Sequence, residues 1–258
     1  MAGHSKWANI KRQKARVDAK KGQVFARLSR AIIVAARHGL PDPDANFQLR
    51  SAIEKAKAAG IPNENIDRAI AKGSGQWGQD GDDWEEIRYE GYGPGGVAVL
   101  IEAMTDNRNR TAADLRSAFS KQSGNLGETG CVSWMFNQMG VVTLQSPPPE
   151  EALLELLLEV GASSYEFFAT EATAEVYTEV NQLDTVAQTL KQTGCLVENA
   201  ELRWIPQSTV TLEDPETAQQ FVRLMEALED LDDVQTVTAN AELDQDWIEA
   251  SDSLNFKG

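Results

Sequence analysis

Electric charge is distributed very unevenly along this chain of 258 residues, and that distribution limits both its fold and its partners. The first 37 residues contain ten Lys and Arg side chains and a single acid, Asp18, which gives this stretch a net charge of +9. Residues 38–75 are neutral overall, residues 76–145 carry −5 and residues 146–258 carry −20. A basic end attracts polyphosphate, whereas an acidic body limits non-specific adhesion elsewhere.

Composition is otherwise that of an ordinary globular protein. Hydrophobic residues make up 41% of the chain, which is enough to form cores, and the length suits one large domain or a few small ones. No apolar run approaches the roughly 20 residues of a membrane-spanning helix, and the first residues lack the apolar stretch of a secretory signal. Cys131 and Cys195 make no disulfide framework. We therefore expect a cytoplasmic protein with no membrane partner.

The basic stretch divides into an arm and a helix. Residues 1–22 combine weak periodicity with crowded Lys and Arg side chains, so we predict an arm that becomes ordered on binding. From residue 23 the apolar residues between Val24 and Ala36 recur at helical spacing. Three arginines fall on the opposite side of this helix: Arg27, Arg30 and Arg37. One helix is thus predicted to have a core face and a basic face.

Two further helices are predicted at 44–59 and 62–72, each followed by a glycine that suits a helix end. Short connections join all three helices into a small bundle over residues 23–75. Residues 73–83 are rich in Gly and Asp and read as a linker.

Beyond the linker, strands and helices alternate. Two strands are predicted around the turn sequence GPGG, at 86–92 and 97–104, and a helix follows at 111–122. Residues 139–205 read as βαββαβ, which is the ferredoxin-like order. The segments on either side of it supply two strands and one helix each, too few for a domain alone but enough together.

We therefore predict an α+β fold with three domains: an N-terminal helical bundle and two ferredoxin-like α+β domains, one inserted in the other. The predicted boundaries are a basic arm at 1–22, the bundle at 23–75, a split domain formed by 84–138 plus 206–245, and an inserted acidic domain at 139–205.

Histidine and cysteine, which are common in catalytic and metal centres, are sparse, whereas carboxylates are abundant in the C-terminal half. His4 and His38 are the only histidines, and neither has a second ligand at metal spacing. GYGPGG at 91–96 lacks the Lys-Ser/Thr pair of a phosphate loop and is typical of a hairpin turn. The acidic run LEDLDD at 228–233 matches no calcium loop and is typical of a solvent-exposed helix end. We predict no catalytic residue, no metal, no cofactor and no small-molecule substrate.

The segment TDNRNRT at 105–111 is the most interesting one in the acidic body. It follows an apolar strand and opens a helix, so one of its Asp or Asn side chains suits the helix cap. Arg108 and Arg110 stand near the helix N-terminus, where backbone N–H groups also favour anions, and Arg116 lies further along. Two interpretations remain open: a second phosphate contact, or arginines that pair with the surrounding acids.

Long motifs resemble a known family. MAGHSKWANIKRQKARVDAKKGQVFARLSR at residues 1–30 is similar to the N-terminal signature of the YebC/PmpR family, and the similarity continues through 60–75, 85–136 and 204–212. The resemblance implies a helical domain and two α+β domains, the third inserted in the second. It also implies a regulator. Members are usually labelled transcriptional regulators, and some are reported to bind promoter DNA. Others act as ribosome-associated translation factors at stretches such as consecutive prolines, and a mitochondrial relative activates translation of a cytochrome c oxidase subunit. No member is established as an enzyme.

We accordingly predict a non-enzymatic, nucleic-acid-binding regulator of gene expression. A basic arm suits irregular RNA cavities and no helix-turn-helix is recognisable, so we favour a ribosome-associated translation factor that contacts ribosomal RNA. A DNA-binding transcriptional regulator is the alternative, favoured by the usual family label and by a basic helix that suits a groove. The candidate contact residues are basic side chains and one tryptophan suited to base stacking: Lys6, Trp7, Lys11, Arg12, Lys14, Arg16, Lys20, Lys21, Arg27, Arg30, Arg37, Arg108, Arg110 and Arg116.

A competing hypothesis of another class is a protein-interaction adaptor. In that case the acidic region 146–258 binds basic partners, and the arm serves only as a tether. Function that survives deletion of residues 1–21 would favour the adaptor. An enzyme is the third class considered, but the sequence nominates no reaction.

Overall fold

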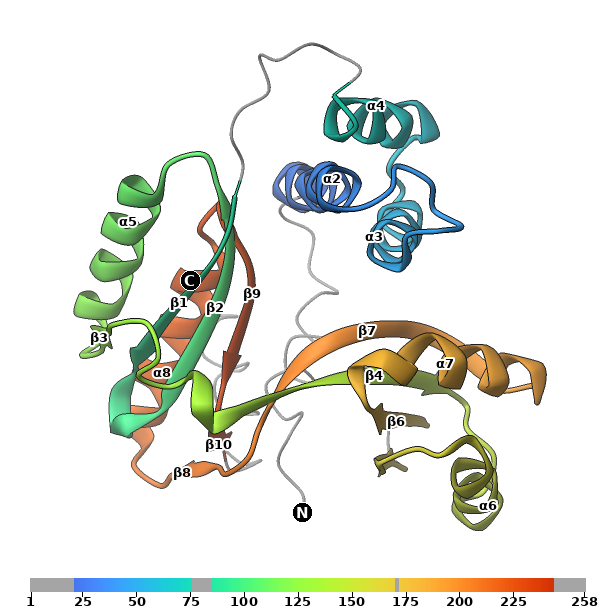
Figure 1. Cartoon of the computed structure of the whole chain (residues 1–258). Coiled ribbons are helices and arrows are strands. Elements are labelled where there is room, and N and C mark those ends of the chain that lie inside the picture. The colour runs from blue at the N-terminus through green and yellow to red at the C-terminus, as the bar shows by residue number, and fades with distance from the viewer. Residues whose placement is uncertain (1–20, 76–84, 170–171, 244–258) are drawn as a thin grey trace. The chain divides into compact units, whose positions relative to one another are not determined.

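The computed structural model describes residues 21–75, 85–169 and 172–243 and confirms an α+β fold (Figure 1). The chain divides into two compact units by its internal contacts. One unit is continuous, from Phe136 to Ile205, and the other combines the segments before and after it.

Three helices form the bundle: α2 (Lys21–His38), α3 (Phe47–Ala58) and α4 (Asn63–Gly73). Helix α2 packs against both of the others. Apolar side chains from all three form the core, for example Ile32, Leu49 and Ile66. Val24, which the periodicity predicts to face inward, is 43% exposed, because burial in α2 is concentrated in its second half, from Ile32 to Ala36.

The side chain of Asn46 fixes the connection between α2 and α3. Its oxygen accepts a hydrogen bond from Leu49 N at 3.1 Å and so caps α3, while its amide nitrogen donates to Ala35 O and Leu40 O at 2.8 Å each. Gly73 ends α4 against α2, where a β-carbon would collide with Ile33 O. The bundle therefore depends on one polar link and one close backbone approach.

After the bundle, the same unit continues with a hairpin, as GPGG predicts. Strands β1 (Glu85–Tyr92) and β2 (Ala98–Thr105) pair antiparallel around the 3-10 turn η1 (Pro94–Gly96), with Tyr92 opposite Ala98. Strands β3 (Asn125–Leu126) and β9 (Val234–Ala239) complete a four-stranded sheet in the order β3-β1-β2-β9. Helices α5 (Arg108–Lys121) and α8 (Pro215–Glu229) share a core with this sheet, in which Phe119 and Phe221 are fully buried.

This sheet does not have the ferredoxin-like order predicted for the split domain. Strand β8 (Val210–Leu212) pairs in parallel with β10 (Ala241–Leu243) in a separate two-stranded sheet. The buried Asn240 lies where the two sheets meet: its side-chain oxygen accepts from Ala98 N of β2 at 2.8 Å, and its backbone oxygen accepts from Val210 N of β8 at 2.8 Å. Asn240 thus lies between β9, the edge strand of the four-stranded sheet, and β10 of the two-stranded sheet.

The continuous unit has the predicted βαββαβ order. Its elements are β4 (Phe136–Gln145), α6 (Glu150–Val160), β5 (Ser164–Phe168), β6 (Thr173–Thr178), α7 (Leu183–Gln192) and β7 (Leu196–Pro206). The strands lie in the ferredoxin-like order β5-β6-β4-β7. Leucines of both helices are buried, among them Leu153 and Leu190.

A single buried carboxylate fixes the loop that leads from β3 toward the continuous unit. Glu90 of β1 accepts hydrogen bonds from the backbone N–H groups of Gly130, Val132 and Ser133 at 2.7 to 2.8 Å. Burial alone would raise the pKa of Glu90, but these three N–H donors outweigh burial and hold the pKa below its ordinary value. The ionised form is therefore the one that stabilises the fold.

The substitution Glu90→Gln tests this directly. Glutamine keeps one acceptor oxygen but turns an amide donor toward N–H groups, so we expect the unfolding free energy at pH 7 to fall by about 1 to 3 kcal/mol. The lowered pKa means that the wild type's advantage is present above the unfolded pKa of about 4.3 and is lost as pH falls through the folded value. Urea unfolding at pH 7 and pH 3 measures the difference. Glu86→Gln, an exposed neighbour, serves as control, and an equal gap at both pH values would contradict the account.

Candidate nucleic-acid interface

Most of the predicted arm lies outside the described residues. This applies to Lys6, Trp7, Lys11, Arg12, Lys14, Arg16 and Lys20. Lys21 is the first residue of α2, and its side chain is likewise outside the description. The arm therefore remains a prediction from sequence, and the geometry concerns the arginines of α2 and α5.

Two arginines of α2 contact the last residue of α8 and the turn that follows it. Arg27 donates from Nη2 to Glu229 O at 2.6 Å, and Arg30 donates to Asp232 O. Backbone carbonyls at a helix C-terminus carry partial negative charge, so they suit a guanidinium. Burial lowers the pKa of Arg27, with Glu229 acting in the opposite direction. Arg37, near the end of the same helix, is half-buried.

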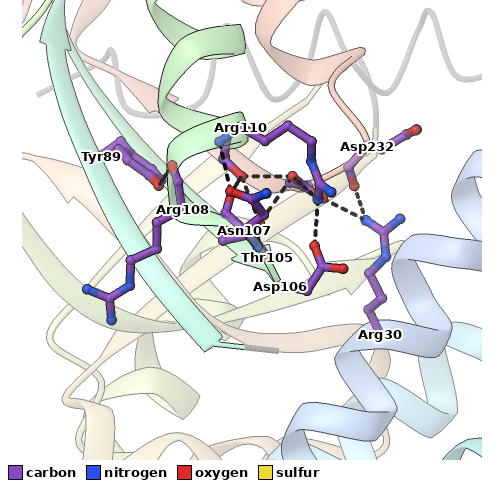
Figure 2. Close-up of polar contacts among 10 residues, drawn as sticks. Arg30, Tyr89, Thr105, Asp106, Asn107, Arg108, Arg110 and Asp232 are labelled. Atoms are coloured by element: carbon purple, nitrogen blue, oxygen red, sulfur yellow. Dashed lines mark hydrogen bonds and ion pairs between the residues drawn. The ribbon is translucent and has the colours of Figure 1, made fainter. Parts of the chain in front are cut away.

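The segment 105–111 folds as a strand end and a capped helix start (Figure 2). Asn107 is the N-cap of α5, and its side chain accepts from Arg110 N at 3.1 Å. Thr105 Oγ1, at the end of β2, accepts from Asn107 N at 2.9 Å. These two bonds fix the direction in which the α5 arginines leave the backbone.

Asp233 is the centre of this corner. Its carboxylate accepts from Thr111 Oγ1 at 2.8 Å, from Thr105 Oγ1 at 3.2 Å and from Arg110 Nη2 at 2.9 Å. The prediction that LEDLDD is a solvent-exposed helix end is wrong for Asp233, which is only 7% exposed. The reason is long-range: Met104 N donates to Asp233 O at 2.8 Å, just before β9 pairs with β2, and this places the side chain beside Thr105.

Both arginines at the start of α5 have carboxylate partners. Arg110 contacts Asp106 at 2.7 Å as well as Asp233. Arg108 points away from that cluster in Figure 2 and forms a two-pronged ion pair with Glu85. The pair raises the pKa of Arg108 and lowers that of Glu85. The geometry thus favours the second interpretation of this corner, in which the arginines pair with acids.

Arg116 differs from its neighbours on α5. It is exposed, and no hydrogen bond or ion pair joins it to another residue in the described ranges. Of the three candidate arginines on α5, Arg116 is the one that can bind a phosphate without first breaking an ion pair with a carboxylate.

A hollow of about 630 Å³ opens beside this corner. Its charged lining consists of Arg30 and Arg110 against five aspartates: Asp106, Asp114, Asp230, Asp232 and Asp233. The excess of negative charge disfavours phosphate there. Among the residues that the structure describes, no group of three or more His, Cys, Asp or Glu side chains is placed to hold a metal ion.

Sequence reasoning missed Asp233 and Glu85 as partners of the arginines. They lie 123 residues after Arg110 and 23 residues before Arg108, so no local pattern links them. None of the described helices combines the length and the apolarity that a membrane crossing requires.

Comparison with known proteins gives consistent matches over nearly the whole chain. The family models described as TACO1/YebC N-terminal domain and TACO1/YebC second and third domain match residues 5–76 and 84–241. A protein of Acaryochloris marina and one of Gloeothece citriformis, each named a probable transcriptional regulatory protein, are 70% and 67% identical. The alignments cover 94% and 96% of this chain, and 96% and 98% of those relatives.

A solved structure shares the fold. The crystal structure of a conserved hypothetical protein from Aquifex aeolicus superposes with a TM-score of 0.81 at 47% sequence identity. The superposition covers 90% of this chain and 94% of that one.

The corner around Asp233 makes a testable prediction about stability. Asp233→Asn removes the charge that faces Arg110 and turns an amide donor toward other donors, so we expect a loss of about 1 to 3 kcal/mol in unfolding free energy. Asp114→Asn, an exposed aspartate of the same hollow, should change it by less than about 0.5 kcal/mol. Urea unfolding of both variants measures the effect, and equal stabilities would show that Asp233 does not hold the corner.

Proposed function

We propose that this chain, which belongs to the TACO1/YebC family, is a nucleic-acid-binding regulator of gene expression and not an enzyme. We propose further that it acts in the cytoplasm as a ribosome-associated translation factor and contacts ribosomal RNA through its basic N-terminal residues.

One observation carries the proposal: the excess of positive charge is confined to residues 1–37, which carry +9 in a chain of −16. In the acidic body, the arginines of the α5 corner are offset by Glu85, Asp106 and Asp233. A cation that already holds a carboxylate gains little from a phosphate. The N-terminal stretch is therefore the part of the chain best suited to displace counterions from a polyphosphate.

The contacts of α2 support RNA over duplex DNA. A helix that reads a major groove presents an exposed basic face to the bases and phosphates. On α2, Arg27 and Arg30 are instead directed at the carbonyls of Glu229 and Asp232. What remains for nucleic acid is mainly the Lys/Arg-rich sequence before α2. Basic segments of this kind suit irregular RNA, on which they can fold.

DNA is the second candidate, because the relatives from Acaryochloris marina and Gloeothece citriformis are named probable transcriptional regulatory proteins. In that case the same basic stretch would bind phosphates of a promoter duplex. Release of Arg27 and Arg30 from α8 would let α2 join the interface.

The salt dependence of binding tests whether the basic stretch is the interface. If six to ten phosphates are neutralised, the affinity for a ribosomal RNA fragment should fall about 10³- to 10⁵-fold between 50 and 200 mM salt. Replacing Lys11, Arg12, Lys14 and Arg16 together by Ala should reduce the magnitude of that slope by about 3 to 4, the effect of losing four phosphate contacts. Replacing Lys55, Lys57, Arg68 and Arg223 instead removes four cations outside the stretch and should leave the slope nearly unchanged.

Filter binding or fluorescence anisotropy measures the salt slope. Adding a duplex DNA of equal length as competitor compares RNA with DNA. A flat salt response, or equal losses in the two variants, would contradict binding through the arm. If unlabelled duplex DNA displaces the bound RNA fragment as effectively as unlabelled RNA does, the transcriptional alternative is favoured. Full function after deletion of residues 1–21 would favour the adaptor.

The α5 arginines give a finer test in the same assay. Arg116→Ala should reduce the salt slope by about 1, the effect of losing one phosphate contact. Arg108→Ala should leave the slope unchanged, because Arg108 is already neutralised by Glu85. A larger effect of Arg108→Ala than of Arg116→Ala would mean that nucleic acid displaces Glu85, and that the corner is a phosphate site.

A further inference from the structure

Helix α6 of the continuous unit exposes two leucines on one side. Leu153 and Leu157 are buried in the core of the unit, whereas Leu154 is 43% and Leu158 is 74% exposed. Residues four apart on a helix are neighbours on its surface, so Leu154 and Leu158 form an apolar stripe one turn long. We refer to this pair as the α6 stripe.

A column of carboxylates runs beside the α6 stripe. Glu151, Glu155 and Glu159 follow one another at intervals of four residues, and all three are exposed. Like charges at this spacing repel each other and disfavour the helix. No ion pair joins any of the three to another residue in the described ranges. The helix therefore carries two unfavourable features side by side, exposed apolar surface and unscreened negative charge.

The surrounding unit does not supply compensating cations. Residues 136–205 contain eleven acids against two bases, Lys191 and Arg203. Arg203 is held by the fully buried Glu175, whose Oε1 lies 2.9 Å from Arg203 Nη2. Lys191 lies on α7 and forms no ion pair with the three glutamates of α6 in the described ranges. One lysine is also too few for three carboxylates, so full neutralisation of the column needs cations from outside this unit.

Charge decides which occupant the surface suits. Nucleic acid and anionic lipid are repelled by the column and by the net charge of the unit. A second copy of the same surface would bring Glu151, Glu155 and Glu159 against their own equivalents, because a two-fold interface is self-complementary. A cationic amphipathic partner removes both unfavourable features at once, since its apolar residues cover the stripe and its Lys or Arg side chains meet the column.

We propose that α6 is a docking surface for a basic amphipathic helix of another protein, with Leu154 and Leu158 as the apolar anchors and Glu151, Glu155 and Glu159 as the charge partners. The partner presents apolar residues and Lys or Arg at spacings of three and four residues. The surface is small, so the complex is weak and transient. This interaction is independent of nucleic-acid binding by the N-terminal stretch.

The test uses the full-length protein and a labelled synthetic helix of Leu, Lys and Ala, about 15 residues long so that it can be helical. Fluorescence anisotropy measures its affinity against that of a scrambled peptide of the same composition. We expect the ordered peptide to bind about tenfold more tightly than the scrambled one. Leu154→Gln with Leu158→Gln, and separately Glu151→Gln with Glu155→Gln and Glu159→Gln, should each weaken binding about tenfold or more.

Leu196→Gln is the matched control, because Leu196 is 64% exposed in the same unit but lies outside α6. It should leave the affinity unchanged. Circular dichroism melts check that the variants fold, and Leu154→Ala with Leu158→Ala provides a second version of the stripe variant that preserves helix propensity.

Equal affinity of the wild type and both stripe variants would overturn the proposal, since it would show only general attraction of a cationic peptide to an acidic protein. Tighter peptide binding after deletion of residues 1–21 would also overturn it, because the chain's own basic stretch would then be the occupant. Sedimentation that reveals a dimer dependent on Leu154 and Leu158 would overturn it in favour of a second copy.

Discussion

A cation can attract nucleic acid only where the protein's own carboxylates have not already neutralised it, and this constraint organises the whole chain. At the start of α5 two arginines are paired with carboxylates of the same chain: Arg108 pairs with Glu85 and Arg110 with Asp233. Arg27 on α2 is directed at a carbonyl of α8. The net positive charge is left in the first 37 residues. Segregation of charge along the sequence thus separates a basic end, for which we propose polyphosphate binding, from an acidic body.

Within the body, Asp233 shows how one buried charge is made tolerable. A desolvated carboxylate is costly unless hydrogen bonds and a counter-charge satisfy it. Two threonine hydroxyls and the guanidinium of Arg110 do so here, and they come from the end of β2 and the start of α5. The same contacts join the residue before β9 to the end of β2 and to the start of α5. The pairing of Arg110 with Asp233 therefore has two consequences: it stabilises the fold, and it leaves Arg110 less available to a phosphate.

Local patterns predicted much of the fold. Helical spacing of apolar residues predicted the bundle, and GPGG between two apolar runs predicted the β1–β2 hairpin. Both predictions succeed because each pattern is formed by residues close together in the sequence. Strands β3 and β10 are too short to show alternation. The separate β8–β10 sheet depends on Asn240 contacting Ala98, 142 residues away. The pairing of Arg110 with Asp233 is equally remote, which is why the sequence left the role of the α5 arginines open.

Ultraviolet crosslinking in living cells, with sequencing of both the recovered RNA and the recovered DNA, tests the central claim most directly. The account predicts discrete sites in ribosomal RNA that disappear when Lys11, Arg12, Lys14 and Arg16 are replaced by Ala. Sites at promoter DNA without enrichment of ribosomal RNA would contradict it and identify a transcriptional regulator.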